Sequence, residues 1–111
     1  MIPAVQRTGY FPADFAGQFE WYFEHAGEEV AFQFKSTLEA TMQKLIQQPA
    51  MGRARRFRDP RLKNLRSFRV AAPFRKLLIF YRLQGDSLDF VRLIHGARDL
   101  SRRLTQPPGA D

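Results

Sequence analysis

Residues 74–95 decide the fold, and they read FRKLLIFYRLQGDSLDFVRLIH. The run from Leu77 to Tyr81 is apolar at every position, which is typical of a central strand buried on both faces. Gln84-Gly85-Asp86 has the composition of a hairpin turn. The stretch therefore predicts two antiparallel strands, over residues 74–83 and 87–95. In the second strand, alternation places Leu88, Phe90, Arg92 and Ile94 on one face and Val91, Leu93 and His95 on the other.

Two further strands and two helices precede this hairpin. Residues 65–71 alternate charged and apolar side chains, and residues 4–11 show a weaker alternation, so both segments are predicted strands. Apolar residues at helical spacing predict helices over 13–25 and 28–48; they are Phe15, Phe19, Tyr22 and Phe23 in the first, and Val30, Phe34, Leu38, Met42 and Leu45 in the second. The short break at Gly27 makes the two helices antiparallel neighbours.

The order of elements predicts an α+β fold. A helical hairpin packs on one face of a small, mostly antiparallel sheet in the order β-α-α-β-β-β, and a short helix over 97–104 follows. Residues 50–64 form a polar, arginine-rich connection between the helices and the later strands. We expect one domain over residues 1–104 and a disordered tail over 105–111, which contains Pro107-Pro108-Gly109.

The composition excludes several classes of protein. The chain has 111 residues, of which 44% are hydrophobic, so one folded domain with a real core is expected. It has no cysteine, which excludes disulfides and thiolate metal sites. The first residues, from Met1 to Ala4, lack the pattern of a signal peptide, and no apolar run is long enough to span a membrane. We therefore expect a cytoplasmic protein without a metal, a cofactor or a membrane partner.

Charge is distributed unevenly along the chain. The formal net charge is +7, but residues 1–50 carry −3 and residues 51–104 carry +11. Thirteen of the fifteen cations in the second segment are arginines, whose planar donors suit phosphates and carboxylates. This pattern favours a polyanion or an acidic protein as the partner. The alternative is a solubilising surface without a specific ligand.

Arginines are the candidate contact residues. Arg53, Arg55, Arg56 and Arg58 lie in the polar connection, where a loop can touch phosphates. Arg69, Arg82 and Arg92 fall one on each of the three later strands, and they form a cationic patch on one sheet face if the strands are in register. Otherwise they are scattered residues that form surface ion pairs.

Candidates for acid–base chemistry are few. The sequence contains no glycine-rich phosphate loop, no paired-histidine metal spacing and no Ser/His/Asp signature. His95, at the end of the last predicted strand, can shuttle a proton or can simply fix the junction with the following helix. Tyr81 can donate a proton or stack against a ligand, or it can be a core residue with its hydroxyl at the edge.

The later part of the chain resembles a known family. The stretches 65–70, 74–82, 85–86 and 90–100 are similar to the RelE/ParE superfamily of toxins from bacterial toxin–antitoxin pairs. The ending His95-Gly96-Ala97-Arg98-Asp99-Leu100 resembles the ParE, or plasmid-stabilisation, branch in particular. The resemblance covers roughly residues 10–104, and the fold that it implies agrees with the order of elements above.

The resemblance implies two mechanisms. ParE-like toxins inhibit DNA gyrase by protein contact, and the contact residues would then be the arginines above together with Arg98. RelE-like toxins cut messenger RNA on the ribosome, which would give catalytic roles to Tyr81, His95 and Arg82. The continuation into Arg98-Asp99-Leu100 favours the ParE-like mechanism. A basic nucleic-acid-binding module is a third possibility, with a steep salt dependence as its signature.

The resemblance also implies an antitoxin as partner. The first helix carries more aromatic residues than contact with a core requires, namely Phe19, Trp21, Tyr22 and Phe23. The resemblance implies that an extended or helical acidic segment of the antitoxin lies over the toxin and pairs with its exposed apolar and arginine surface, and we expect these aromatic residues to form a groove for it. The alternative is that they are additional core.

Overall fold

The computed structural model describes residues 3–109 and contains three α-helices and five strands in that range. In chain order these are β1 (Ala4–Arg7), α1 (Phe11–His25), α2 (Glu28–Gln47), β2 (Arg53–Ala54), β3 (Leu65–Arg69), β4 (Leu77–Gln84), β5 (Ser87–His95) and α3 (Leu100–Arg103). Two short 3-10 helices, η1 (Pro49–Met51) and η2 (Pro60–Leu62), lie in the connection between α2 and β3. No helix among the described residues is long and apolar enough to cross a membrane.

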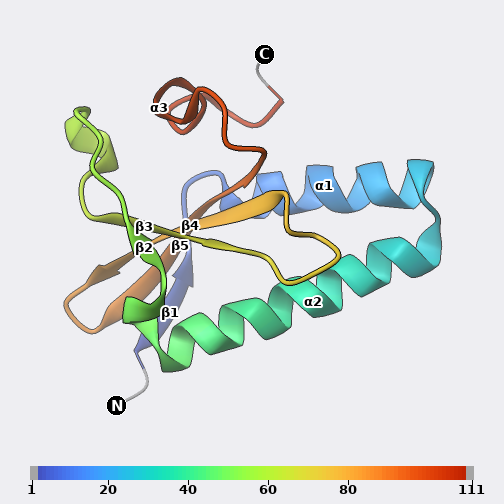
Figure 1. Cartoon of the computed structure of the whole chain (residues 1–111), viewed down its shortest axis with the longest axis horizontal. Coiled ribbons are helices and arrows are strands. Elements are labelled where there is room, and N and C mark those ends of the chain that lie inside the picture. The colour runs from blue at the N-terminus through green and yellow to red at the C-terminus, as the bar shows by residue number, and fades with distance from the viewer. Residues whose placement is uncertain (1–2, 110–111) are drawn as a thin grey trace.

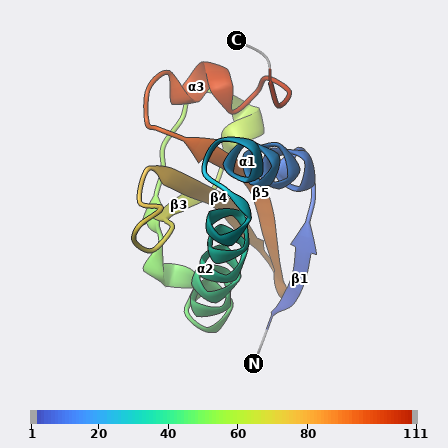
Figure 2. The same cartoon turned by 90° about the vertical axis from the view of Figure 1, so that its right-hand side faces the viewer.

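The five strands form one sheet in the order β1-β5-β4-β3-β2 (Figure 1). β1 is parallel to β5, and the other neighbouring strands are antiparallel. β4 is the middle strand, as the apolar run Leu77–Tyr81 predicts. Figure 2 shows α1 and α2 nearly end-on, with β1 on one side of them and β3 on the other. The predicted α+β fold with a helical hairpin against the sheet is confirmed.

Each face of the sheet has its own apolar core. On the face of the helical hairpin, Phe34 and Leu45 of α2 pack with Ile79, Tyr81 and Phe90 of the sheet. The opposite face has a smaller cluster that joins the sheet to η2 and the C-terminal segment; its buried members are Leu62, Leu65, Leu78, Phe80, Ile94, Leu100 and Leu104. The sheet is therefore covered on both sides, which explains why β4 is apolar at consecutive positions.

The strict alternation predicted for β5 is wrong, because the strand contains a bulge. Phe80 pairs with Arg92 and Tyr81 with Phe90, so Val91 is an extra residue on β5. Leu88, Phe90 and Leu93 consequently contact the hairpin face, whereas Ile94 belongs to the opposite cluster. β1 ends opposite Phe90, which leaves the edge of β5 uncovered at the bulge. There the carboxylate of Asp14 accepts a hydrogen bond from the Leu93 amide at 2.9 Å.

Smaller differences concern the connections. The helix predicted over 97–104 begins at Leu100, because Gly96 and Asp99 adopt left-handed backbone conformations, with φ of 81° and 54°. The two-residue strand β2 lies inside the connection that the sequence indicated as irregular. The disordered tail at 105–111 stays a prediction; its last two residues lie outside the described residues, and Arg92 donates a hydrogen bond to the carbonyl of Gln106.

Candidate functional site

A groove of about 610 Å³ lies along the edge of β3, beyond the point where β2 stops pairing. Its five cations come from three parts of the chain: Lys44 from α2, Arg53 and Arg55 from β2 and the residues after it, and Arg69 and Arg75 from β3 and the following turn. Apolar side chains complete its walls, among them Met51, Phe68, Val70 and Leu78. We call this set of residues the cationic groove.

Hydrogen bonds hold two of the groove arginines in place. Arg55 donates from Nε to Oγ of Ser67 at 2.8 Å, and its guanidinium lies 5.9 Å from the centre of the Phe80 ring. Arg69 donates from Nη1 to the carbonyl of Arg75 at 2.8 Å. Both side chains are thus oriented before any ligand binds, which lowers the entropy that binding would cost.

The positive charge of the groove is not neutralised locally. Partial burial lowers the pKa of the Arg55 guanidinium, and repulsion from Arg53 and Arg69 lowers it further. Among residues 3–109, no ion pair involves any of the five groove cations. Such a cluster favours an anionic ligand, because a carboxylate or phosphate would relieve the mutual repulsion.

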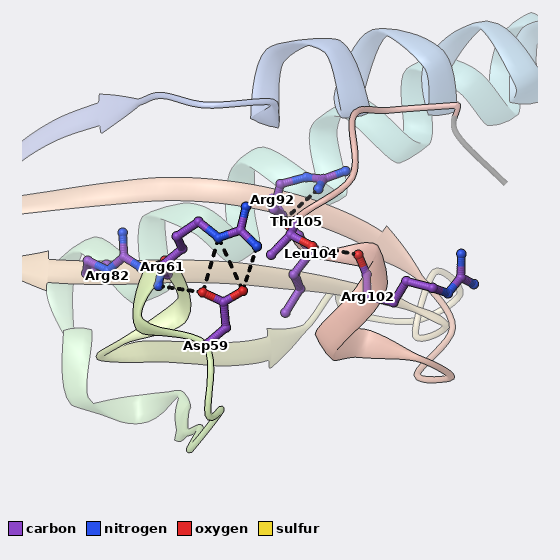
Figure 3. A network of polar contacts seen from close by, with 7 residues as sticks. All are labelled: Asp59, Arg61, Arg82, Arg92, Arg102, Leu104 and Thr105. Carbon is purple, nitrogen blue, oxygen red and sulfur yellow. Dashed lines mark hydrogen bonds and ion pairs between the residues drawn. The ribbon is translucent and has the colours of Figure 1, made fainter.

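Arg92 is a structural residue and is not available for contact with a target, contrary to the prediction. It is 3% exposed, and its guanidinium binds the Asp14 carboxylate through Nε at 2.8 Å and Nη2 at 3.0 Å. Its Nη1 donates to the carbonyl of Leu104, as Figure 3 shows, and also to the carbonyls of Arg103 and Gln106. The ring of Tyr10 lies 5.1 Å from the guanidinium carbon. Arg92 therefore links α1, β5 and the C-terminal segment.

The predicted patch across three strands does not form, because the three arginines are out of register. Arg69 pairs with Leu78 at one end of β4, whereas Arg82 lies opposite Leu65 at the other. Arg82 donates to the carbonyl of Lys63 at 2.8 Å and to that of Arg61 at 3.0 Å, and Figure 3 shows the second of these contacts. Its side chain thereby holds the η2 segment against the sheet.

Tyr81 is a core residue whose hydroxyl fixes the connection after α2. The hydroxyl donates to the carbonyl of Pro49 at 2.6 Å and accepts from the amide of Gly52 at 2.8 Å. The side chain is fully buried, and this burial raises the pKa of its hydroxyl. Gly52 is required here, because a Cβ at this position would lie 2.7 Å from Cε1 of Tyr81.

The three candidate catalytic residues are not brought together. His95 is exposed and pairs with Leu77, four residues before Tyr81 on β4, which separates the two by about 13 Å along the strand. Arg82 alternates with Tyr81 and faces the opposite side of the sheet. Partial burial, together with Lys76 and Arg103, lowers the pKa of His95. Tyr81, Arg82 and His95 therefore do not bring a proton donor and a phosphate-binding arginine to the same phosphate.

The remaining arginines that were predicted to contact a target are exposed. Arg56 and Arg58 lie in the loop after β2, and Arg98 lies in the turn before α3.

Lys44 and Arg75 complete the cationic groove, although neither was predicted from the sequence as a contact residue. Lys44 has the appearance of an ordinary cation in the last turn of a helix, so its sequence context contains no signal for a groove.

The aromatic residues predicted to bind an antitoxin lie on different sides of the helical hairpin. Phe19 contacts Phe32 and Phe23, with ring centres 5.3 and 6.3 Å apart. Tyr22 packs into the core, 5.1 Å from Phe34. Trp21, which is 52% exposed, stacks on His25 at 4.6 Å. Exposed aromatic surface is therefore present, but in two separate areas.

Comparisons with known proteins agree with this fold. The family model described as ParE toxin of type II toxin-antitoxin system, parDE, matches residues 5–100. A chain of the chromosomal ParDE system from P. aeruginosa has the same fold, with a TM-score of 0.70 and 17% identity over 86% of this chain and 98% of that one. A chain of the E. coli DinJ-YafQ toxin-antitoxin complex gives 0.53 and 16%, over 86% and 93%. No curated protein sequence matches the chain.

Proposed function

Since the chain belongs to the ParE toxin family of type II toxin–antitoxin systems, we propose that it inhibits DNA gyrase by protein contact and is neutralised by a cognate antitoxin. The family match over residues 5–100 is the observation that carries this proposal. A toxin of this kind acts where gyrase acts on DNA, so its site of action is the cytoplasm.

A contact mechanism is consistent with the arrangement of the candidate residues. Tyr81 is buried and hydrogen-bonded, Arg82 holds the η2 segment, and His95 lies at the other end of the sheet. Cleavage of RNA requires a proton acceptor, a proton donor and charge stabilisation around one phosphate. The separation of these three residues therefore favours inhibition by binding over a ribosome-dependent nuclease.

The contact surface that we propose for gyrase consists of exposed arginines. They are Arg53 and Arg69 in the cationic groove, and Arg56, Arg58 and Arg98 outside it. Arginine binds carboxylates and phosphates through two parallel hydrogen bonds, so these side chains suit either gyrase or the DNA held by it. Arg82 and Arg92 are excluded from this surface by their contacts inside the fold.

Supercoiling by purified gyrase tests the proposal. The antitoxin-free toxin is expected to inhibit supercoiling and to cause cleaved DNA to accumulate. Arg56→Gln/Arg58→Gln is expected to raise the inhibitory concentration several-fold, because two exposed charge contacts are lost. His95→Gln is the control and is expected to leave inhibition unchanged. Absence of inhibition by a protein that is folded by circular dichroism would reject the gyrase target, and mRNA cleavage on ribosomes would then be measured.

The antitoxin is proposed to cover the exposed aromatic residues of the helical hairpin. Exposed Phe23 beside half-buried Phe19 offers one apolar area, and exposed Trp21 beside half-buried Tyr22 offers the second. Trp21 is the single tryptophan of the chain, so its fluorescence reports on binding. A shift to shorter wavelength on addition of the antitoxin is expected if Trp21 becomes buried, and an unchanged spectrum would exclude it from the interface.

A further inference from the structure

We propose that the outer edge of β1 pairs with the same edge of a second copy of this chain, so that two sheets join into one continuous sheet. The two β1 strands run antiparallel, and the two-fold axis passes beside Gln6 of each copy. The inference goes beyond the proposed function and does not depend on which target the toxin acts on. Three features support it, namely the unpaired backbone groups of β1, the charge at this edge and the exposed side chain of Val5.

β1 presents unpaired backbone groups on its outer edge. It is the last strand of the sheet, and within residues 3–109 it pairs only with β5. The Ala4 amide donates to the carbonyl of Asp86 at 2.9 Å, so it turns toward β5. Because backbone groups alternate between the two edges of a strand, the amides and carbonyls of Val5 and Arg7 turn outward. Figure 2 shows β1 at the outer side of the sheet, away from α2.

These outward groups are self-complementary about Gln6. When Gln6 of one copy lies opposite Gln6 of the other, Val5 of each copy lies opposite Arg7 of the other. Opposite residues of this kind exchange both of their hydrogen bonds, so every outward amide and carbonyl of Val5 and Arg7 gains a partner. The paired stretch is short, because Pro3 has no amide and Gly9, with φ of 60°, begins the turn into α1.

The charge of the chain favours this edge of the sheet over the opposite one. The edge at β2 and β3 carries the five cations of the cationic groove, so two copies that met there would repel each other. Beside β1, a cavity of about 200 Å³ is lined by charges of both signs, which are Arg7, Lys35 and Glu39. In the proposed register each Arg7 faces Val5, and no like charges lie directly opposite each other.

Val5 supplies apolar surface to the pair. Its side chain is 41% exposed, although it lies beside Leu88, which is fully buried on the helical face. A second strand at this edge would cover part of that exposed surface. Because the paired stretch is short, the buried area is small, and we expect a weak dimer with a dissociation constant of roughly 100 µM.

Sedimentation equilibrium of the full-length toxin tests the pairing. We expect a change from monomer to dimer between about 10 µM and 1 mM protein. Val5→Pro removes an outward amide and none that pairs with β5, and it should weaken dimerisation roughly tenfold or more. Val5→Thr keeps the amide and the branched side chain, and it should change dimerisation by less than about threefold. A monomeric wild type, or undiminished dimerisation of Val5→Pro that is folded by circular dichroism, would overturn the proposal.

Single cysteines test the register, because the chain has none of its own. Gln6→Cys places the two thiols at the two-fold axis, where opposite Cα atoms lie about 4.5 Å apart, within the range of a disulfide. Ala4→Cys is the matched control, since Ala4 is also exposed and faces the same side of the sheet. Across the axis, however, it lies about 13 Å from its copy. Under mild oxidation Gln6→Cys should form cross-linked dimers at least roughly tenfold faster. Equal rates would reject the register.

The antitoxin is the competing occupant of this edge, and amide hydrogen exchange distinguishes the two. Pairing of toxin copies predicts that the Val5 and Arg7 amides of the antitoxin-free toxin exchange more slowly as the toxin concentration rises. In Val5→Pro, the Arg7 amide should lose this dependence on concentration. Protection that is independent of toxin concentration and appears only when antitoxin is added would assign the edge to the antitoxin and overturn the proposal.

Discussion

Arg92 and the cationic groove use the same residue type in opposite ways. Arg92 is buried, and each of its three guanidinium nitrogens donates to an acceptor supplied by Asp14 or by a backbone carbonyl. The groove gathers four arginines and Lys44 around an open sheet edge without a carboxylate partner among the described residues. The first arrangement links parts of the fold, whereas the second leaves cations available to bind an anionic ligand.

The difference shows that positive charge by itself does not mark a binding residue. Arg92 and Arg69 both lie on strands in the basic half of the chain. Nothing in the local sequence therefore distinguishes a structural arginine from one that is free to bind a ligand. What separates them is a distant residue, Asp14, which the fold brings to the bulge of β5. An acid supplied from 78 positions away satisfies one arginine, and no such acid reaches the other.

Replacing Arg92 is expected to have the largest effect on stability. Arg92→Ala would leave the Asp14 carboxylate buried without its cation, and would remove the donor shared by the carbonyls of Arg103, Leu104 and Gln106. Removal of one partner from a buried pair costs about 3–5 kcal/mol. The free energy of unfolding, measured by urea denaturation, should fall by this amount.

Asp14→Ala should destabilise the protein to a similar extent, since it leaves the Arg92 guanidinium buried without a carboxylate and removes the acceptor of the Leu93 amide. A loss below about 1 kcal/mol in both variants would mean that the pair behaves like a surface ion pair, and would contradict the contrast drawn above.

Gly52→Ala is expected to have the next largest effect. Its Cβ would lie 2.7 and 2.8 Å from ring atoms of Tyr81, so the ring or the start of β2 must move. Overpacking of this kind costs about 1–3 kcal/mol. Gly17→Ala is the matched control, because Gly17 lies in α1 with no atom within 4 Å of the added Cβ. It should raise stability by up to about 1 kcal/mol, through higher helix propensity.

Thermal unfolding of the two glycine variants measures this difference. A neutral result for Gly52→Ala would mean that the Tyr81 ring or the start of β2 moves aside at little cost, and would contradict the tight contact between them.

The sequence predicted the elements with strong periodicity and missed features that depend on distant contacts. The apolar run of β4 and the 3.6-residue stripes of α1 and α2 each reflect one buried surface, so local spacing was sufficient. The bulge at Val91 is accompanied by a hydrogen bond from the Leu93 amide to Asp14, far away in the chain, and β2 is too short to leave a pattern. Local reasoning cannot anticipate either feature.

The candidate site was predictable in part for the same reason. Arg53, Arg55 and Arg69 were identified as contact residues, and they do line the groove. Lys44 and Arg75 join them only because α2 and the turn after β3 meet at the same edge. Arg92 was assigned to the surface because no local signal distinguishes a buried, paired arginine from an exposed one.

Arg69→Gln is expected to leave stability nearly unchanged, in contrast with Arg92. Loss of the hydrogen bond to the Arg75 carbonyl is offset by reduced repulsion on Arg55, so the free energy of unfolding should change by less than about 0.5 kcal/mol. Because salt screens the repulsion between the groove cations, added salt should stabilise the wild type more than the variant. An equal response to salt would indicate that the groove cations do not repel one another appreciably.

The titration of His95 is expected to have the smallest effect on stability. Partial burial, Lys76 and Arg103 together lower its pKa, so an NMR titration should give a midpoint below the ordinary value of 6.5. The folded state then binds fewer protons than the unfolded state as the pH falls below 6.5, and stability decreases slightly over that interval as the pH falls through the midpoint. Lys76→Gln should move the midpoint back upward, because one neighbouring positive charge is removed. A midpoint at or above 6.5 in the wild type would show that burial, Lys76 and Arg103 do not disfavour the charged imidazole, and would contradict this prediction.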